Sequence, residues 1–220
     1  MRPLLNGGTL GGRMSRSHAD IVELVREGAL EAIAALSSDP EDPLLTFALC
    51  TDDDVSGVFH VGCTLQFART SEFPDVRFQP TDFAQTGQCS PEALDMASEE
   101  FQRDDRRPKG PGWAQARDDD FNAMAEGLAA ARATGKIPDS VFMTVMSTDP
   151  GDHMSSLEEN WLPRLNAPEV LRLWRQWRLD CARSWLSGLQ AKREPLSYGD
   201  EYRIECLRLE VQRFEALLKS

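Results

Sequence analysis

The chain lacks long apolar runs and has few basic residues. No stretch approaches the ~20 apolar residues of a membrane helix, and the opening MRPLLNGGTLGGRM lacks the apolar core of a signal peptide. We therefore expect a cytoplasmic protein with no membrane partner. There are 24 Lys and Arg against 36 Asp and Glu, a net charge of −12 at pH 7. A nucleic-acid binder needs a basic face to displace counterions from phosphates, so this balance argues against a nucleic-acid partner.

Catalytic and metal-binding signatures are also missing. The five cysteines form no C-x-x-C pair, the three histidines are scattered, and no G-x-S-x-G or glycine-rich loop after a strand occurs. The sequence therefore predicts no enzyme, no catalytic residues, no metal and no cofactor. Cys50 and Cys63 could face each other across a hairpin, but in a reducing cytoplasm we expect free thiols.

Two short acidic segments partly match metal-binding patterns. Residues 52–57 begin like a calcium-binding loop, but its twelfth position is Cys63 instead of glutamate, and strands are predicted on both sides. Asp149, Asp152 and His153 follow a predicted strand and could hold a metal, although Asp-Pro-Gly-Asp is also ordinary turn chemistry. The turn interpretation is favoured, and a metal-dependent hydrolase using these three residues stays as an alternative.

Charge is distributed unevenly along the chain. Residues 1–162 hold 13 basic and 28 acidic residues, whereas residues 163–220 hold 11 basic and 8 acidic ones. A charge of this size bears on partners and solubility instead of fold. It is compatible with a basic partner that binds the acidic body.

Periodicity predicts an ordered series of helices and strands in the first three quarters of the chain. Two apolar runs flank the turn formers TDDDVSG and predict a β-hairpin. Residues 65–90 show no clear period and contain several prolines, so mostly loop is expected there. The expected helices are 17–36, 91–102, 118–134 and 156–165, and the expected strands are 44–50, 58–64 and 141–147. Asp118–Asp120 are expected in the first turn of their helix, where acids suit the helix dipole.

The remaining residues predict an antiparallel helical hairpin formed by helices 168–189 and 200–218. In the second helix, apolar residues recur at alternating spacings of three and four, as in a packed heptad seam. The first helix carries an aromatic stripe, with its arginines on the other side of the helical wheel. Because Trp and Arg are enriched at interfaces, the tail could instead work as a scaffold or oligomerisation module. The predicted contact residues are Trp174, Trp177, Ile204, Leu207, Val211 and Phe214.

These elements predict an α+β fold with a small, mainly antiparallel sheet covered by helices and a C-terminal helical hairpin. The expected organisation is a flexible N-terminal extension (1–16), an acidic α+β domain (17–166), and a helical hairpin (167–220) packed on that domain or extending from it.

The order and the residue pattern of several segments resemble those of a bacterial family known as domain of unknown function 4303. The matching segments, within about residues 17–180, are LLTFALCTDDD, GVFHVGCT, FNAMAEGLAAARATGKI, VFMTVMSTD and RLNAPEVLRLW. The chain departs from the family around residues 75–112, and the helix at 199–218 looks like an addition. Small acidic families of this kind resemble the immunity proteins of bacterial toxin systems. No functional residue carries over from the resemblance.

Charge and resemblance together predict an immunity or antitoxin-type protein that binds and neutralises a cognate basic toxin, plausibly a nuclease. Its acidic loops would imitate the charge of nucleic acid and speed encounter with the toxin. The candidate partner-binding residues are Asp52, Asp53, Asp54, Asp118, Asp119, Asp120, Asp149 and Asp152.

Overall fold

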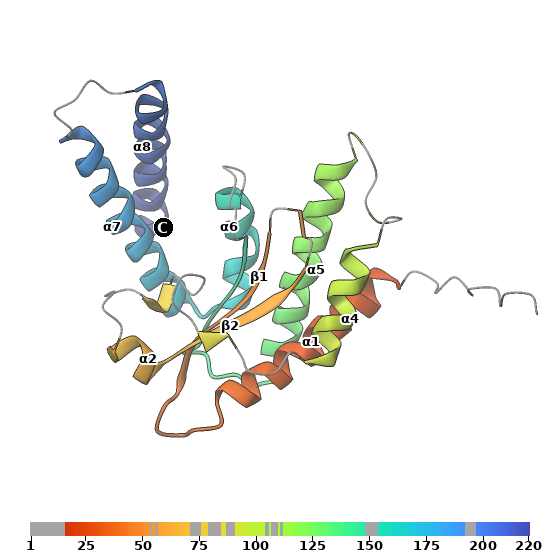
Figure 1. Cartoon of the computed structure of the whole chain (residues 1–220). Coiled ribbons are helices and arrows are strands. Elements are labelled where there is room, and N and C mark those ends of the chain that lie inside the picture. Colours follow the sequence, from red (N-terminus) through yellow and green to blue (C-terminus); the bar gives the residue numbers. More distant parts are fainter. Residues whose placement is uncertain are drawn as a thin grey trace, which may run out of the picture.

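The computed structural model combines a small central sheet with helices on both sides of it (Figure 1). It describes residues 16–52, 54–55, 57–70, 76–78, 85–86, 91–103, 106, 110, 112–147, 154–191 and 197–220. Most of the chain is helical, and the predicted α+β class is confirmed.

The sheet has the strand order β3-β2-β1-β4. Its strands are β1 (Leu44–Thr51), β2 (Phe59–Thr64), β3 (Gln85–Thr86) and β4 (Phe142–Ser147). β1 and β2 form the predicted antiparallel hairpin, in which Cys50 lies opposite Phe59 and Thr46 lies opposite Cys63. Cys50 and Cys63 are therefore not cross-strand partners, and both are free thiols, as expected. β4 adds to the other edge of β1 in parallel, which makes the sheet mixed.

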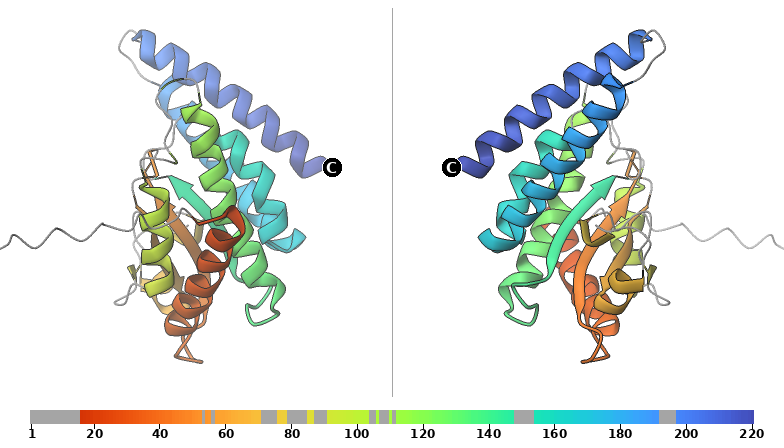
Figure 2. Two further views of the ribbon diagram at one scale, coloured as in Figure 1. Left: turned by 90° about the vertical axis from the view of Figure 1, so that its right-hand side faces the viewer. Right: turned by 90° about the vertical axis from the view of Figure 1, so that its left-hand side faces the viewer.

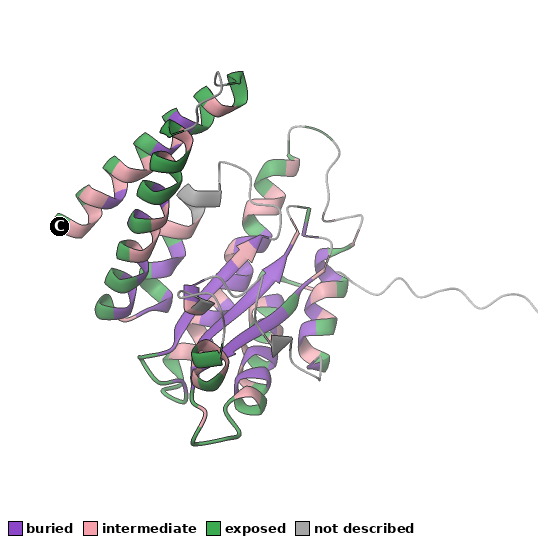
Figure 3. Ribbon diagram, turned by 60° about the vertical axis from the view of Figure 1, so that its left-hand side comes forward, coloured by how far each residue is buried: buried purple, intermediate pink, exposed green. Residues whose placement is uncertain are grey.

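Helices α1 (His18–Leu36), α4 (Glu92–Phe101) and α5 (Trp113–Ala133) cover one face of the sheet (Figure 1). The Ser17 side chain accepts a hydrogen bond from the Asp20 backbone, and Asp20 bonds back, which is a capping box at the predicted start of α1. Ile21, Val25 and Ala29 on one side of α1 are fully buried, whereas Leu36 at its end is partly buried. The strands are buried along most of their length, so the core lies between this face of the sheet and the helices (Figure 3).

Helices α1 and α5 cross so closely that Gly127 leaves no room for a side chain. A Cβ at this position would overlap the Val25 side chain and lie 2.9 Å from the Val22 carbonyl oxygen. We expect Gly127→Ala to lower the free energy of unfolding by about 1–3 kcal/mol, because the two backbones would have to separate. Gly188→Ala is the matched control, since Gly188 also lies in a helix but has open space around it.

The control substitution should raise the free energy of unfolding by roughly 0.5–1 kcal/mol through the entropy of the unfolded chain. Urea denaturation of the two variants beside the parent measures both effects. If the two substitutions changed the free energy of unfolding equally and in the same direction, the close crossing of α1 and α5 would be contradicted.

The outer edge of β4 is closed by a side chain instead of by another strand. After α6 (Met154–Leu165), the buried Asn166 accepts a hydrogen bond from the Met143 backbone N–H at 2.7 Å. Its side-chain amide donates to the Met143 carbonyl at 2.8 Å and to the Leu162 carbonyl at 3.1 Å. Asn166 therefore supplies to one residue of the edge strand the donor and acceptor that a neighbouring strand would provide.

Helices α7 (Pro168–Gln190) and α8 (Tyr198–Lys219) pack together as the predicted hairpin, which projects from the body (Figures 1 and 2). The buried Phe214 ring of α8 meets the Trp174 ring of α7 edge to face, with centroids 5.6 Å apart. Trp174 in turn stacks on Phe142 of β4 at 6.3 Å. The hydrophobic core thus continues from the sheet into the base of the hairpin.

Three local expectations were wrong. Residues 65–90 are not mostly loop where they are described, since α2 (Leu65–Thr70) follows β2 directly and a 3-10 turn covers Val76–Phe78. The aromatic stripe predicted for α7, with Trp174, Trp177 and Trp185 on one side, is not buried throughout, because Trp185 has 55% of its surface exposed. The arginines of α7 do not all face solvent, because Arg175 and Arg178 are largely covered and ion-paired.

The expected N-terminal extension falls almost wholly outside the described residues. Its last residue, Arg16, is described and is anchored. The Arg16 backbone N–H donates to a Glu100 carboxylate oxygen at 3.3 Å, and its guanidinium lies 3.6 Å from the other oxygen. Arg16 therefore contacts the body through the last turn of α4.

Candidate binding surface

The carboxyl ends of β1 and β4 lie side by side at one end of the sheet. In the parallel register, Thr51 is the partner of Ser147, so the segments after both strands leave the sheet at the same place. Helix α5 runs antiparallel to β4, because Arg132 in its last turn donates hydrogen bonds to the carbonyls of Pro138 and Val141, just before β4. The first half of α5 consequently reaches the same end of the sheet (Figure 1).

Helix α4 contributes a further acid at this end. The Val58 backbone N–H, just before β2, donates to the Ser98 hydroxyl in the last turn of α4 at 3.1 Å. The neighbouring Glu99 is exposed. We use the name acidic end for the surface that carries the exposed acids Asp54, Glu99 and Asp119, which come from three separate segments of the chain.

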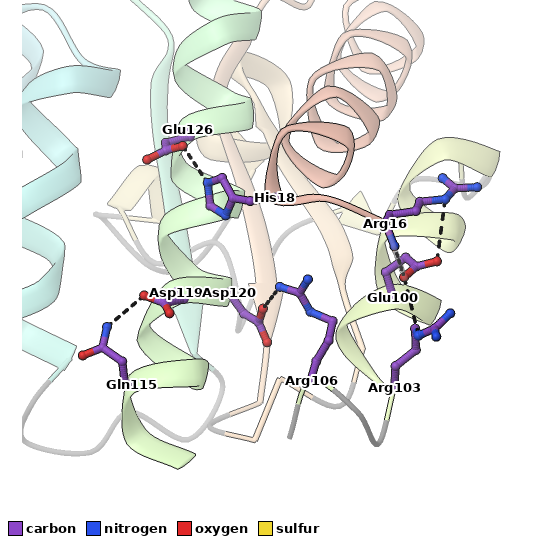
Figure 4. Close-up of polar contacts among 9 residues, drawn as sticks. All are labelled: Arg16, His18, Glu100, Arg103, Arg106, Gln115, Asp119, Asp120 and Glu126. Atoms are coloured by element: carbon purple, nitrogen blue, oxygen red, sulfur yellow. Dashed lines mark hydrogen bonds and ion pairs between the residues drawn. The ribbon is translucent and has the colours of Figure 1, made fainter. Parts of the chain in front are cut away.

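The Asp118–Asp120 prediction needs correction. Helix α5 begins at Trp113, so these residues lie in its second turn and do not start the helix. Asp120 is only 4% exposed and accepts a 2.8 Å hydrogen bond from Arg106 (Figure 4). A buried, ion-paired carboxylate supports the fold more than it supports a surface contact, so Asp120 is a poor candidate for binding a partner.

The two neighbours of Asp120 differ in how their charge is balanced. Asp118 is half-buried, and Arg117 donates to it at 3.0 Å. Asp119 is exposed and accepts a hydrogen bond from the neutral Gln115 amide at 2.8 Å (Figure 4). Gln115 brings no positive charge, so Asp119 is the member of this group best placed to present negative charge to a partner.

Other acids near α4 and α1 have side-chain partners. Glu100 is buried between Arg16 and Arg103, and His18 lies 2.9 Å from Glu126 (Figure 4). Pairing of this kind compensates the cost of burying the Glu100 carboxylate. Glu100 and Glu126 therefore have structural partners within the fold.

The turn after β1 is anchored by Val55. The Val55 backbone N–H donates to the Asp52 carbonyl at 3.1 Å, and its side chain is 1% exposed. Its φ of +50° is unusual for a β-branched residue and carries strain. Burial of the side chain holds that conformation and so fixes the exposed Asp54 beside it, while Asp52 is half-buried. The candidates Asp53, Asp149 and Asp152 lie outside the described residues, as does His153.

Three buried polar groups near this end have no hydrogen-bond partner among the described residues. They are the Thr51 hydroxyl, at the last position of β1, the Trp161 indole N–H of α6, and the Nε–H of Arg106. Trp161 stacks on Phe121 of α5, with ring centroids 6.1 Å apart. Phe121 directly follows Asp120 in the sequence. Buried groups of this kind are rare, because each loses its hydrogen bonds to water.

The two buried thiols have little capacity for nucleophilic chemistry at neutral pH. Burial raises the pKa of Cys50 to about 12 and that of Cys63 to about 11, which suppresses the reactive thiolate of both. Burial also lowers the pKa of His60, which stacks on Phe47. Within the described part of the chain, no three His, Cys, Asp or Glu side chains are grouped as metal ligands would be.

A charged cluster joins α6 to the hairpin on the other side of the sheet. Arg175 pairs with Glu159 at 2.9 Å, and Arg178 donates to Glu210 of α8. Burial raises the pKa of Glu158, even though Arg178 lies 3.9 Å away. These contacts connect three helices and show no open site.

A surface pocket of about 390 Å³ lies at the opposite, amino end of the sheet. Apolar side chains from α1, from the start of β1 and from the α5–β4 connection form most of its wall, with Asp39 and Lys136 as the charged members. The described acids of the acidic end are absent from its lining.

The sequence did not point to Glu99 or Arg106 as residues of this region. Glu99 is one of two consecutive glutamates at the end of a predicted helix, but nothing local shows that this helix ends beside β2. Arg106 falls in a polar stretch, and its pairing with Asp120 depends on a contact that periodicity does not report.

One comparison with known proteins identifies a relationship. A family described as domain of unknown function (DUF4303) matches residues 25–167, from the middle of α1 to the residue before α7. No curated protein and no solved structure matches the chain. Among the described helices, none is long and apolar enough to cross a membrane.

Proposed function

Because the chain belongs to the DUF4303 family, whose description assigns no activity, we propose a function from the acidic end itself. The protein acts as a cytoplasmic immunity or antitoxin-type protein that binds and neutralises a basic bacterial toxin. The observation that carries this proposal is the convergence of Asp54, Glu99 and Asp119 at one end of the sheet.

Two features support a binding role for this end. Its acids come from segments anchored to the core through Val55, Ser98 and the packed helix α5, so their relative positions are set before a partner arrives. Preorganised charge loses less conformational entropy on binding than charge on a loose loop. The net charge of −15 over residues 1–162 adds a long-range field of the same sign.

This field would attract a basic partner before the two proteins come into contact. Complementary charge raises association rates, and groups at the rim of an interface act mainly on that step. Exposed acids such as Asp54 and Asp119 would therefore speed encounter, while contacts that are desolvated in the complex would slow dissociation. The toxin would be a protein with a basic surface, for which a nuclease is the natural example because its substrate is itself an anion.

The test uses the protein encoded next to this chain in its genome, co-purified and then measured by stopped-flow association at low and high salt. The variant Asp54→Asn with Asp119→Asn removes two exposed acids from the acidic end. The control, Glu31→Gln with Glu41→Gln, removes two exposed acids near the amino end of β1. We expect association at low salt to slow by roughly tenfold in the variant only, and this difference to shrink at high salt.

Thermal unfolding of both variants should match the parent, since all four acids are exposed or half-exposed. Failure to retain a neighbouring gene product, or equal rates in the variant and the control, would overturn the proposal. Metal-dependent hydrolysis through Asp149, Asp152 and His153 makes a different prediction, namely a stoichiometric metal in elemental analysis of the purified protein.

A further inference from the structure

Glu158 of α6 is a largely covered carboxylate that accepts no hydrogen bond from the described residues. Only 14% of its side chain is exposed, and its ion-pair contact is with Arg178 of α7 at 3.9 Å, which is too long for a hydrogen bond. The next residue, Glu159, is instead paired with Arg175 at 2.9 Å. Buried polar groups are normally hydrogen-bonded, so Glu158 lacks the compensation that usually accompanies burial of a carboxylate.

Arg178 gives its hydrogen bonds to a competing acid. Its Nε donates to the Glu210 carboxylate of α8 at 3.1 Å, and a terminal NH2 group donates to the same oxygen. The guanidinium also lies over the rings of Trp174 and Phe214, 5.7 Å from each centroid. These contacts direct Arg178 toward α8, so Glu158 receives the attraction of a shared cation without a hydrogen bond.

The other charges around Glu158 do not offset its burial. Glu159 and Glu210 repel its negative charge, whereas Arg178 and Arg213 attract it. Strand β4, which contacts α6, carries no ionisable side chain, and no described residue of α5 is among the charges that act on Glu158. Burial is the largest effect, and it raises the pKa of Glu158 above its ordinary value.

The direction of the pH dependence follows from this raised pKa. With α8 docked, the chain holds the Glu158 proton at pH values where an exposed glutamate has lost it, so docking is accompanied by proton uptake. The stability that this group contributes is therefore present in acid and is lost as the pH rises through the raised pKa. Residues 167–220 contain no histidine, so the hairpin adds no side chain that ordinarily titrates between about pH 5 and pH 8.

We propose that Glu158 is a pH-sensitive switch at the junction of α6, α7 and α8, which holds α8 more firmly in mild acid than at neutral pH. Protonation removes an uncompensated negative charge from the junction and leaves Arg178 to Glu210 of α8. Because this junction lies on the other side of the sheet from α4 and α5, the inference stands apart from the proposed function.

The test is hydrogen exchange of the α8 amides in the full chain, expressed as protection factors so that the pH dependence of exchange itself cancels. In the parent, protection of α8 should fall by roughly tenfold between about pH 5 and pH 7.5, the effect of about one pKa unit. Glu158→Gln keeps the shape of the side chain but cannot ionise. Its protection factors should change by less than about twofold over this range and exceed those of the parent at the upper pH.

Glu215→Gln is the matched control, because Glu215 pairs with Arg183 across the α7–α8 contact at 2.7 Å but is more exposed than Glu158. This variant leaves Glu158 in place and should keep the pH dependence of the parent. A second measurement needs no variant: the carboxyl carbon of Glu158, followed by NMR in the parent, should titrate with a midpoint above 4.5, the ordinary value for glutamate.

Four results would overturn the proposal. They are a parent in which α8 protection does not change with pH, a pH dependence that persists in Glu158→Gln, a pH dependence lost equally in Glu215→Gln, and a Glu158 midpoint at or below 4.5. Circular dichroism at each pH establishes that the three proteins remain folded during the exchange.

Discussion

Replacing Phe214 with alanine is expected to lower the free energy of unfolding by about 3–5 kcal/mol. The ring is 1% exposed and meets Trp174 edge to face, and the Arg178 guanidinium lies over it at 5.7 Å. Alanine would leave a cavity at the base of the hairpin and remove the aromatic contact, which adds to the loss of buried area. Urea unfolding monitored by tryptophan fluorescence measures the change, because Trp174 reports on this contact.

Leu173→Ala provides the comparison for this substitution. Leu173 lies one residue before Trp174 but is 48% exposed, so its truncation should change stability by no more than about 0.5 kcal/mol. A loss below about 1 kcal/mol for Phe214→Ala would mean that α8 does not pack on α7 in solution.

We expect Asn166→Ala to lower the free energy of unfolding by about 2–5 kcal/mol. The substitution removes all three hydrogen bonds of the side chain and leaves the Met143 N–H and carbonyl without that partner at a buried edge. Each orphaned buried group costs roughly 1–3 kcal/mol. Hydrogen exchange should also show faster exchange of the Met143 amide, which is a local signature that simple loss of packing would not give.

Asn160→Ala is the matched control, because Asn160 lies in the same helix, α6, but is exposed. This substitution should change the free energy of unfolding by no more than about 0.5 kcal/mol. If the two asparagine variants were equally stable, the closure of the β4 edge by Asn166 would be wrong.

Elements set by local signals were predictable from the sequence. Helix α1 starts at its capping serine, and the β1–β2 hairpin follows from two apolar runs around turn formers. The hairpin of α7 and α8 follows from heptad spacing, which records the side each helix buries. In each case the signal lies within the element that it sets.

Features that depend on distant residues were not predictable. Helix α5 has no side-chain cap at Gly112. The run Asp118–Asp120 was therefore wrongly predicted to begin the helix. Arg175 and Arg178 are covered because their carboxylate partners come from α6 and α8, which a helical wheel of α7 does not include.

The acidic end was predictable only in part. Asp54 and Asp119 were identified from the sequence. That they lie at the same end of the sheet depends on the parallel pairing of β1 with β4, which the expectation of a mainly antiparallel sheet did not specify, and on the antiparallel course of α5. Glu99 joins them through a contact between α4 and the residue before β2. Charge counts show how many acids exist, whereas topology decides which of them share a surface.

The parallel pairing of β1 with β4 also sets an order of events during folding. The hairpin of β1 and β2 closes a short loop, but β4 reaches β1 only after the whole segment through α5 has been placed. Pairings distant in sequence form slowly, because the entropy of closing the chain comes before the contacts that compensate it. Until then the central strand presents an open, apolar edge, and such an edge can recruit a strand from another molecule. Slow docking of β4 would make a partly folded chain prone to aggregation, and α1 and α5 would protect it best by packing first.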